Sequence, residues 1–511
     1  MGVAGTRIAR GSAWLSAGQF ISTVIAFAGS IAIARLLKPD EYGLIGIALI
    51  LPGLLLGLLD LGVSEAIIRF SPLDKGRGYI STVFVFKVAM AVTTSLLVFI
   101  LSDYMADALN RPYITPMIKI LSIYALGEIV NGAVGQVLIG VGEYDKAGFL
   151  SIVRSFVRVV SSILLIVIGL GVYGSIWGFS IASASVLAVS LIYVSKYIDS
   201  IKFEIELFKE IVKFSLPLYI PALLGLPLNQ IVNIFLARYV TNIELGNYSV
   251  ASNLLVPLGI VGDSMATSIY STLPLLVDRG DKLREVVYKS VTYTSIIILP
   301  MAMGLIVFSK SLVYLIYSAQ YSLAPVYLSL SALTGLTVVL GSYVIGPYLK
   351  SIGETVKVMK ISFVNCFIYV PLALLLIPAY RVVGLIVSGV IAGFFSTLYG
   401  LYIIHKDFRL EIATKRNIVI LGTLSLPAVA AWLTGFLPLP SIMIKFLLEA
   451  TLYLALLALV LILVMRKSEI LELIDMTRNI KLLGLIIQKL LSVILAISNL
   501  LEDTKVKVLR K

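Results

Sequence analysis

Five ionisable side chains lie inside apolar stretches of this sequence, and their types suit the binding of a charged ligand. Lys87 interrupts the stretch VFVFKVAMAV, while Arg154 and Arg158 are four residues apart, a spacing that places both on one face of a helix. Asp60 and Glu128 carry the opposite charge. A charge at the centre of a bilayer costs about 2.5–3.5 kcal/mol, so such side chains usually face protein or a water-filled cavity. The pattern therefore predicts electrostatic binding of an anion in a hydrated cationic cavity.

Catalytic chemistry is not indicated by the remaining residues. The chain has one cysteine, Cys366, which excludes an internal disulfide framework. Its single histidine, His405, ends an apolar run and reads as an interfacial residue, not as a base or ligand. The sequence offers no metal-ligand cluster, phosphate-binding glycine loop or Ser-His-acid arrangement. We therefore expect a protein that is not an enzyme and that needs no metal or other cofactor.

The elements that must position these charges are membrane-spanning helices. Of the 511 residues, 59% are hydrophobic and only 14% are charged, which excludes an ordinary soluble globule. Apolar runs of roughly 20 residues recur along the chain, the length that a helix needs to cross a hydrocarbon layer about 30 Å thick. We therefore predict an all-α polytopic membrane protein. Its fourteen predicted spans are 12–34, 43–68, 79–102, 117–139, 149–171, 173–195, 214–237, 246–275, 289–309, 325–347, 361–379, 382–405, 417–437 and 442–465.

Basic residues alternate between the two sides of the predicted spans. Arg7 and Arg10 precede the first span, and every second break after it carries a cluster of lysine and arginine. The opposite breaks hold only Arg35, Lys38, Arg111, Arg238, Lys310 and Arg381. By the positive-inside rule the chain is a multi-pass protein of the cytoplasmic membrane with both termini in the cytoplasm. The formal net charge of +13 follows from this asymmetry, so we expect anionic membrane lipids, and no nucleic acid, as partners.

An internal repeat relates the two halves of the chain. The stretch ARLLKPDEYGLIGIA, which begins at Ala34, returns as ARYVTNIELGNYSVA at Ala237, and the same offset of 203 carries Asp60 onto Asp263. The stretch GEYDKAGFLSIV returns 211 residues later as GETVKVMKISFV. Because six is an even number of spans, two six-helix copies share their orientation, as in transporters built of parallel repeats around a central cavity.

The repeat and the charge pattern together predict the domain organisation. We expect a first lobe of six helices in 1–198, a second in 199–408, two extra spans in 409–466, and a cytoplasmic amphipathic tail in 467–511. The segment 482–501 could be a fifteenth span, but that would export the basic end DTKVKVLRK. We therefore expect it to lie in the plane of the membrane.

The buried charges also allow structural interpretations. Lys87 could pair with Asp60 or Glu128 and hold helices together, and Arg154 and Arg158 could reach phosphates of the inner leaflet with their long side chains. Arg35 could anchor a loop, and the two repeat-related acids could bond neighbouring helices. Both interpretations stay open for the candidate cationic ligands and polar positions, namely Lys87, Arg154, Arg158, Arg35, Asp60, Glu128, Asn233 and Asp263.

The segments ARLLKPDEYG, DLGVSEAIIRF and GEYDKAG, with arginines in the span that follows, resemble those of the polysaccharide (O-antigen type, Wzx-like) flippases of the multidrug/oligosaccharidyl-lipid/polysaccharide exporter superfamily. The resemblance covers residues 1 to about 465 and is clearest in the first 160. It implies a two-lobed transporter, expected to be a monomer, that moves a polyprenyl-(pyro)phosphate-linked oligosaccharide without covalent chemistry. Transport would then draw on an ion gradient or the membrane potential.

For individual residues the resemblance implies that Lys87, Arg154 and Arg158 attract the phosphate linkage, and that Asn131 and Gln136 contact sugar. The chain departs from the pattern in two places. Many relatives have an acid where this chain has Asn233, and the multidrug branch has an acid in the first span, where this chain offers Gln19. These departures leave the site of a coupling ion open.

Three other functions stay open. The number of spans also fits a lipid II flippase, and a cation-coupled multidrug antiporter is a further option. From another class, a membrane-embedded glycosyltransferase or polymerase would place catalytic residues in a sizeable outer loop. The predicted outer loops are short, and the longest lie near 103–116 and 310–324.

Overall fold

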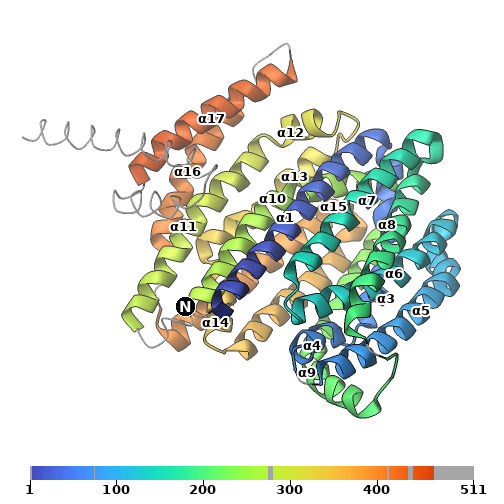
Figure 1. Cartoon of the computed structure of the whole chain (residues 1–511). Coiled ribbons are helices and arrows are strands. Elements are labelled where there is room, and N and C mark those ends of the chain that lie inside the picture. Colours follow the sequence, from blue (N-terminus) through green and yellow to red (C-terminus); the bar gives the residue numbers. More distant parts are fainter. Residues whose placement is uncertain are drawn as a thin grey trace, which may run out of the picture. The chain divides into compact units, whose positions relative to one another are not determined.

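The computed structural model describes residues 3–73, 75–198, 200–273, 280–410, 412, 414–435 and 441–464. Within these ranges the chain is helical and contains no strand (Figure 1). The α-helical class predicted from the sequence is therefore confirmed. The predicted tail 467–511, including the segment 482–501, lies outside the described residues.

The helices follow one another with short connections. In the first half they are α1 (Val3–Leu36), α2 (Pro39–Ala48), α3 (Ile50–Leu58), α4 (Val63–Phe70), α5 (Gly76–Ala108), η1 (Pro112–Ile114), α6 (Thr115–Gly140), α7 (Tyr144–Leu165), η2 (Ile166–Leu170), α8 (Gly171–Val194), η3 (Ser195–Tyr197) and α9 (Ile205–Tyr239). In the second half they are α10 (Asn242–Thr272), α11 (Gly280–Val307), α12 (Ser309–Ile316), α13 (Ala324–Ala332), η5 (Leu333–Leu340), α14 (Ser342–Ser351), α15 (Thr355–Phe408), α16 (Thr414–Thr434) and α17 (Ile442–Val464).

Among the described residues, ten helices are long and apolar enough to cross a membrane, or eleven if the bent pair Ala324–Leu340 and Ser342–Ser351 forms one span. Two of the ten, Tyr144–Tyr197 and Thr355–Phe408, are 54 residues long. A helix of that length would extend about 80 Å, more than twice the hydrocarbon thickness. Each therefore has the length of two predicted spans, and the total of fourteen stays a prediction.

The predicted continuous span 43–68 is wrong in one respect, because the structure divides it into α2, α3 and α4. Leu61 and Gly62 between α3 and α4 have φ angles of 53° and 70°, a left-handed conformation that glycine adopts readily and that ends a right-handed helix. At the equivalent place of the second repeat, 203 residues later, the residue is Met265, and α10 continues without a break.

Backbone geometry supports the repeat inferred from the sequence. Gly142 and Gly353, which are 211 residues apart, have φ angles of 84° and 82°. The residue after each glycine donates its backbone N–H to the carbonyl five residues earlier, at 2.8 and 2.9 Å. The breaks inside the two 54-residue helices also agree, since Gly171 has φ 52° and ψ −134° and Arg381 has φ 52° and ψ −128°.

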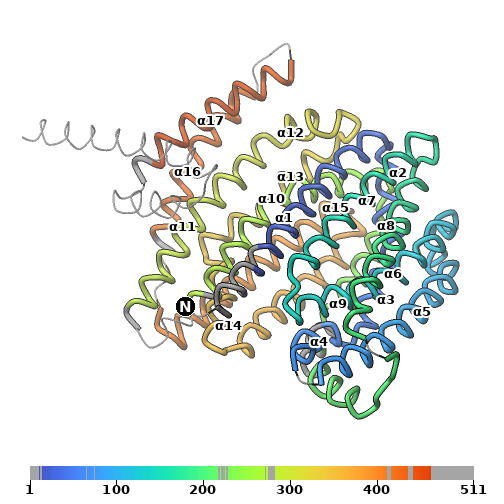
Figure 2. The backbone as a smooth tube through the Cα atoms, in the orientation of Figure 1, coloured from blue at the N-terminus to red at the C-terminus, as the bar shows by residue number. Residues whose placement is uncertain are grey.

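The chain divides into two compact units. The first comprises Met1–Asn253, Ile316–Leu323 and Cys366–Ser388, and the second comprises Leu254–Leu315, Ala324–Asn365 and Gly389–Lys511. In the first unit α5 packs along α6, and α7 packs along α1 and α8 (Figure 2). In the second unit α11 packs on α16, and α16 packs on α17. The division into lobes by repeat stays a prediction.

Candidate functional site

Lys87 lies in a buried ion pair within the first unit. Only 2% of its side chain is exposed, and its Nζ atom lies 2.5 Å from Asp60 Oδ1. The ammonium group also donates to Ser64 Oγ at 3.1 Å and to the Asp60 carbonyl oxygen at 3.4 Å. These partners match the three hydrogens of an ammonium group. Of the two acids that the sequence left open as partners, the structure selects Asp60, and substrate binding by Lys87 stays a prediction.

The ion pair lies at the break between α3 and α4. A helix break inside a membrane frees backbone carbonyls that must find other donors. The hydroxyl of Tyr219 on α9 lies 2.7 Å from the carbonyl oxygens of both Gly57 and Leu58, and Lys87 reaches that of Asp60. Lys87 and Tyr219 therefore satisfy the broken end of α3 and tie it to α5 and α9.

A second charged cluster connects α6, α7 and α8. Arg154 Nη1 binds Glu128 Oε1, and the Arg158 guanidinium lies 5.0 Å from the ring centre of Phe179, a cation–π contact. With Tyr124, these residues line a cavity of about 240 Å³. Because two guanidinium groups face one carboxylate, the cluster carries one excess positive charge. The predicted cationic pair is thus brought to a cavity wall, with Glu128 as its counter-ion.

Polar groups without partners face the neighbouring cavity of about 220 Å³, which Arg154 also lines. Asn131 is 7% exposed and donates through Nδ2 to the Ser183 carbonyl at 3.0 Å, but its Oδ1 atom has no hydrogen-bond partner among the described residues. Gln136 Oε1, in the same cavity, and Glu128 Oε2, in the cavity of about 240 Å³, also have no hydrogen-bond partner among the described residues. Buried acceptors are normally satisfied, so these three oxygens are unusual polar groups beside the two cavities, and sugar binding by Asn131 and Gln136 stays a prediction.

The other candidates predicted from the sequence lie elsewhere. Arg35 at the end of α1 donates through Nε to the Ile316 carbonyl at 2.6 Å, a contact between the end of a helix and a loop. Asn233 on α9 is exposed and donates to Gln230 Oε1 at 3.3 Å. Asp263 is an exposed residue of α10 in the second unit. Within the first unit, the structure does not bring Arg35 or Asn233 into the Arg154 cluster.

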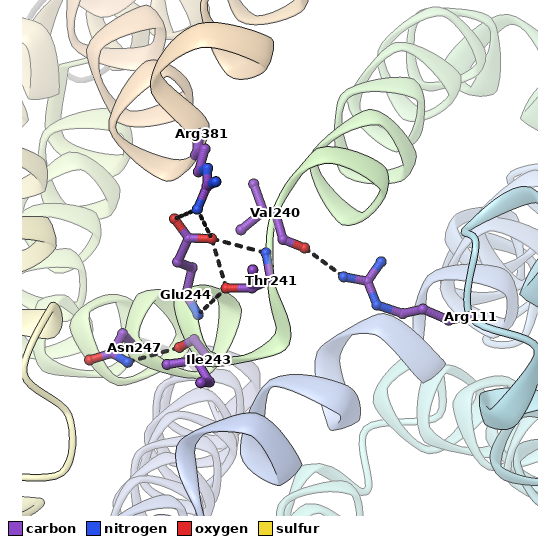
Figure 3. A network of polar contacts seen from close by, with 7 residues as sticks. All are labelled: Arg111, Val240, Thr241, Ile243, Glu244, Asn247 and Arg381. Carbon is purple, nitrogen blue, oxygen red and sulfur yellow. Dashed lines mark hydrogen bonds and ion pairs between the residues drawn. The ribbon is translucent and has the colours of Figure 1, made fainter.

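The sequence analysis did not predict a third polar cluster, which lies between the end of α9 and the start of α10. Figure 3 shows this cluster. Glu244 accepts hydrogen bonds from the Thr241 backbone N–H at 3.0 Å and from its hydroxyl at 2.7 Å. Arg381 Nη1 lies 3.3 Å from both carboxylate oxygens of Glu244. Nearby, Arg111 Nη2 donates to the Val240 carbonyl at 2.5 Å. This cluster too lies within the first unit.

Two sequence signals could have located this third cluster. Arg111 and Arg381 are among the few basic residues in the predicted outer breaks. Glu244 is the repeat equivalent of Glu41, which accepts the Lys38 backbone N–H at 3.1 Å, so each repeat starts this helix with the same cap. Burial lowers the pKa of the Arg111 guanidinium, but arginine still stays charged at neutral pH.

The fold is that of a polytopic helical membrane protein, and the Arg154 cluster in its first unit carries a net positive charge. The family model for polysaccharide biosynthesis proteins matches residues 32–325, more than half of the chain. The chain therefore belongs to the polysaccharide biosynthesis protein family.

Two curated relatives carry names from polysaccharide biosynthesis, and a solved structure shares the fold. The chain is 22% identical over 444 residues to the lipopolysaccharide biosynthesis protein WzxC of Escherichia coli (strain K12), covering 85% of this chain and 86% of that one. It is 21% identical over 324 residues to the succinoglycan biosynthesis transport protein ExoT of Rhizobium meliloti (strain 1021), covering 63% of this chain but only 65% of ExoT, less than two thirds. The fold matches an inward closed conformation of the lipid II flippase MurJ with a TM-score of 0.73 at 15% identity, over 88% of this chain and 98% of that one.

Proposed function

We propose that this protein is a flippase that moves a polyprenyl-(pyro)phosphate-linked oligosaccharide across the cytoplasmic membrane by alternating access. The family, the two curated relatives and the fold all support transport in polysaccharide biosynthesis. The observation that carries the proposal is the pair Arg154 and Arg158 at the wall of a cavity of about 240 Å³, next to a second cavity that Asn131 and Gln136 line. Guanidinium groups suit phosphate oxygens, and the amides suit sugar hydroxyls.

The same proposal includes the orientation, oligomeric state, energy source and partners of the transporter. Both termini lie in the cytoplasm, since the basic residues gather in the breaks on that side. The protein acts as a monomer, makes and breaks no covalent bond, and needs no cofactor. An ion gradient or the membrane potential drives net movement. Membrane lipids and the lipid-linked oligosaccharide are its partners.

The test is flipping of a fluorescent, pyrophosphate-linked prenyl oligosaccharide in proteoliposomes. Wild-type protein should move the lipid, and Arg154→Gln and Arg158→Gln should each slow it about tenfold or more, because a hydrogen bond to a charged group contributes about 1.5–3 kcal/mol. Arg238→Gln is the matched control, since Arg238 is an exposed arginine outside the cluster. No movement by wild type, or equal rates in all four proteins, would contradict the proposal.

A lipid II flippase is the second candidate, favoured by the match in fold to MurJ over 98% of that chain. Its substrate also carries a prenyl pyrophosphate, so the cationic cluster suits both lipids. The two functions separate when lipid II and the oligosaccharide lipid are offered to the same vesicles. Movement of lipid II alone would replace our first proposal by this one.

A further inference from the structure

A reciprocal set of contacts joins the two repeats inside the first unit. Arg111, in the connection after α5, donates to the carbonyl oxygens of Ala237 and Val240 at the end of α9. Its Nε also donates to Asn242 Oδ1 at 2.8 Å, and Asn242 Nδ2 donates to the hydroxyl of Tyr113 at 2.9 Å. A residue of the first repeat thus caps the C-terminal end of a helix of the second repeat.

The second repeat returns the same contact. Gln320 Nε2 lies 3.3 Å from the carbonyl oxygen of Ala34 and 3.2 Å from that of Leu37 at the end of α1, and the Tyr321 hydroxyl donates to Ala34 at 2.7 Å. Ala34 and Leu37 are the equivalents, at the offset of 203, of the two residues that Arg111 caps. Each repeat therefore caps the other at corresponding carbonyls.

Between these caps two equivalent glycines meet. A Cβ atom on Gly43 of α2 would overlap the carbonyl oxygen of Asn242, and a Cβ atom on Gly246 of α10 would overlap the carbonyl oxygen of Pro39. The first turns of α2 and α10 therefore touch backbone to backbone, which only glycine permits. Tyr42 is buried beside them and accepts a hydrogen bond from Asn253 at 2.9 Å.

The two caps differ in charge although their positions agree. Arg111 is a cation with several carbonyl partners, whereas Gln320 and Tyr321 are neutral. On the second-repeat side, Arg381 also lies against Glu244 (Figure 3). At the equivalent place the first repeat has Gly171 near Glu41. Hydrogen bonds from a charged donor are about twice as strong as neutral ones. The hydrogen bonds from Arg111 to the end of α9 are thus expected to be stronger than those from Gln320 and Tyr321 to the end of α1.

We propose that these contacts form a releasable outer seam, defined by Arg111, Tyr113, Asn242, Gln320, Tyr321 and the Gly43–Gly246 contact, which must separate before substrate can leave toward the outside. The inference rests on the proposed function and its membrane orientation, which put this end of the helices on the outer side. The hydrogen bonds of the seam lie at helix ends, where they can be exchanged for bonds to water when the seam opens. Arg111 is a positioning residue that sets how readily the seam opens.

The first experiment locks the seam. In a Cys366→Ala background, Tyr113→Cys with Asn242→Cys places two thiols at an accessible hydrogen-bonded pair that bridges the repeats; Tyr113 is 53% exposed. A short, reducible bifunctional thiol reagent should lower flipping at least tenfold, and a reductant should restore it. The control pair Asp103→Cys with Lys119→Cys joins α5 to α6 within one repeat, at 3.0 Å, and should leave flipping unchanged. Equal flipping by the locked and reduced seam pair would overturn the proposal.

The second experiment needs no substrate, so it separates failure of the seam from failure of the flippase assignment. A Tyr42→Cys reporter, buried in the closed seam, should react slowly with a membrane-impermeant maleimide applied from outside. Adding Arg111→Gln should raise the labelling rate about tenfold, and adding Tyr321→Phe should raise it less, because that change removes one neutral hydrogen bond. Arg238→Gln, an exposed arginine of the same helix end, should leave the rate within about twofold. Labelling that neither variant raises would overturn the inference even if the protein flips lipid.

Discussion

At the scale of single residues, the structure separates charges that look alike in the sequence. Lys87 and Arg154 both lie in apolar stretches; the sequence left Asp60 and Glu128 open as partners of Lys87, and it named only lipid phosphates for Arg154. The break after α3 places Asp60 at Lys87, and the packing of α6 on α7 leaves Glu128 to Arg154. A prediction of charge at membrane depth was therefore possible from the sequence. The choice of partner was not, because it depends on how each helix is rotated about its axis.

The ion pair of Lys87 leads to a prediction about stability. Lys87→Met should leave the Asp60 carboxylate without its cation and lower the free energy of unfolding by roughly 1–3 kcal/mol. We use this range because Asp60 is about one third exposed and solvent screens part of its charge. Thermal unfolding in detergent measures the effect.

The double variant Lys87→Met with Asp60→Asn is the matching control for the loss of charge balance. It should recover most of the lost stability, since the uncompensated carboxylate is gone. If the double variant were no more stable than Lys87→Met alone, pairing would not be the main role of Lys87.

At the scale of secondary-structure elements, the two repeats begin alike and then diverge. Both start their second helix with a glutamate cap, yet only the first repeat breaks that helix, at Leu61 and Gly62. The sequence contains the signal for this difference, a glycine in one copy and Met265 in the other. Apolar run length alone concealed the break, because Leu61 and its neighbours keep the hydropathy of a continuous span.

Backbone strain is expected at Arg381, the residue that breaks α15. Its φ of 52° and ψ of −128° match those of Gly171 in the first repeat, a region that glycine occupies without penalty and other residues rarely adopt. Arg381→Gly should therefore be more stable than Arg381→Ala by roughly 1–2 kcal/mol. Both variants lose the ion pair with Glu244, so thermal unfolding of the two compares the strain at this backbone conformation with the larger unfolded-state entropy of glycine. Equal stability would show that the strain does not exceed that entropy.

At the scale of the whole molecule, the distribution of lysine and arginine predicts the orientation in the membrane. In a Cys366→Ala background, a cysteine at Tyr113 should react with an impermeant maleimide applied to intact cells, and a cysteine at Glu206 should react only after the membrane is permeabilised. Both side chains are exposed, at 53% and 79%, so burial does not bias the comparison. The reverse labelling pattern would mean that the termini lie outside.

The sequence by itself determined the class of protein, and it predicted a repeat, an orientation and a set of charges at membrane depth. Hydropathy, loop charge and internal similarity are sums or comparisons along the chain, and they do not depend on how helices pack. Only the tertiary structure decided that Lys87 pairs with Asp60, that Arg158 lies at a cavity wall, and that Arg111 caps the other repeat. The Lys87–Asp60 and Arg111–Val240 contacts join residues 27 and 129 positions apart, and they depend on helix rotation and close approach of backbones, which no local pattern records.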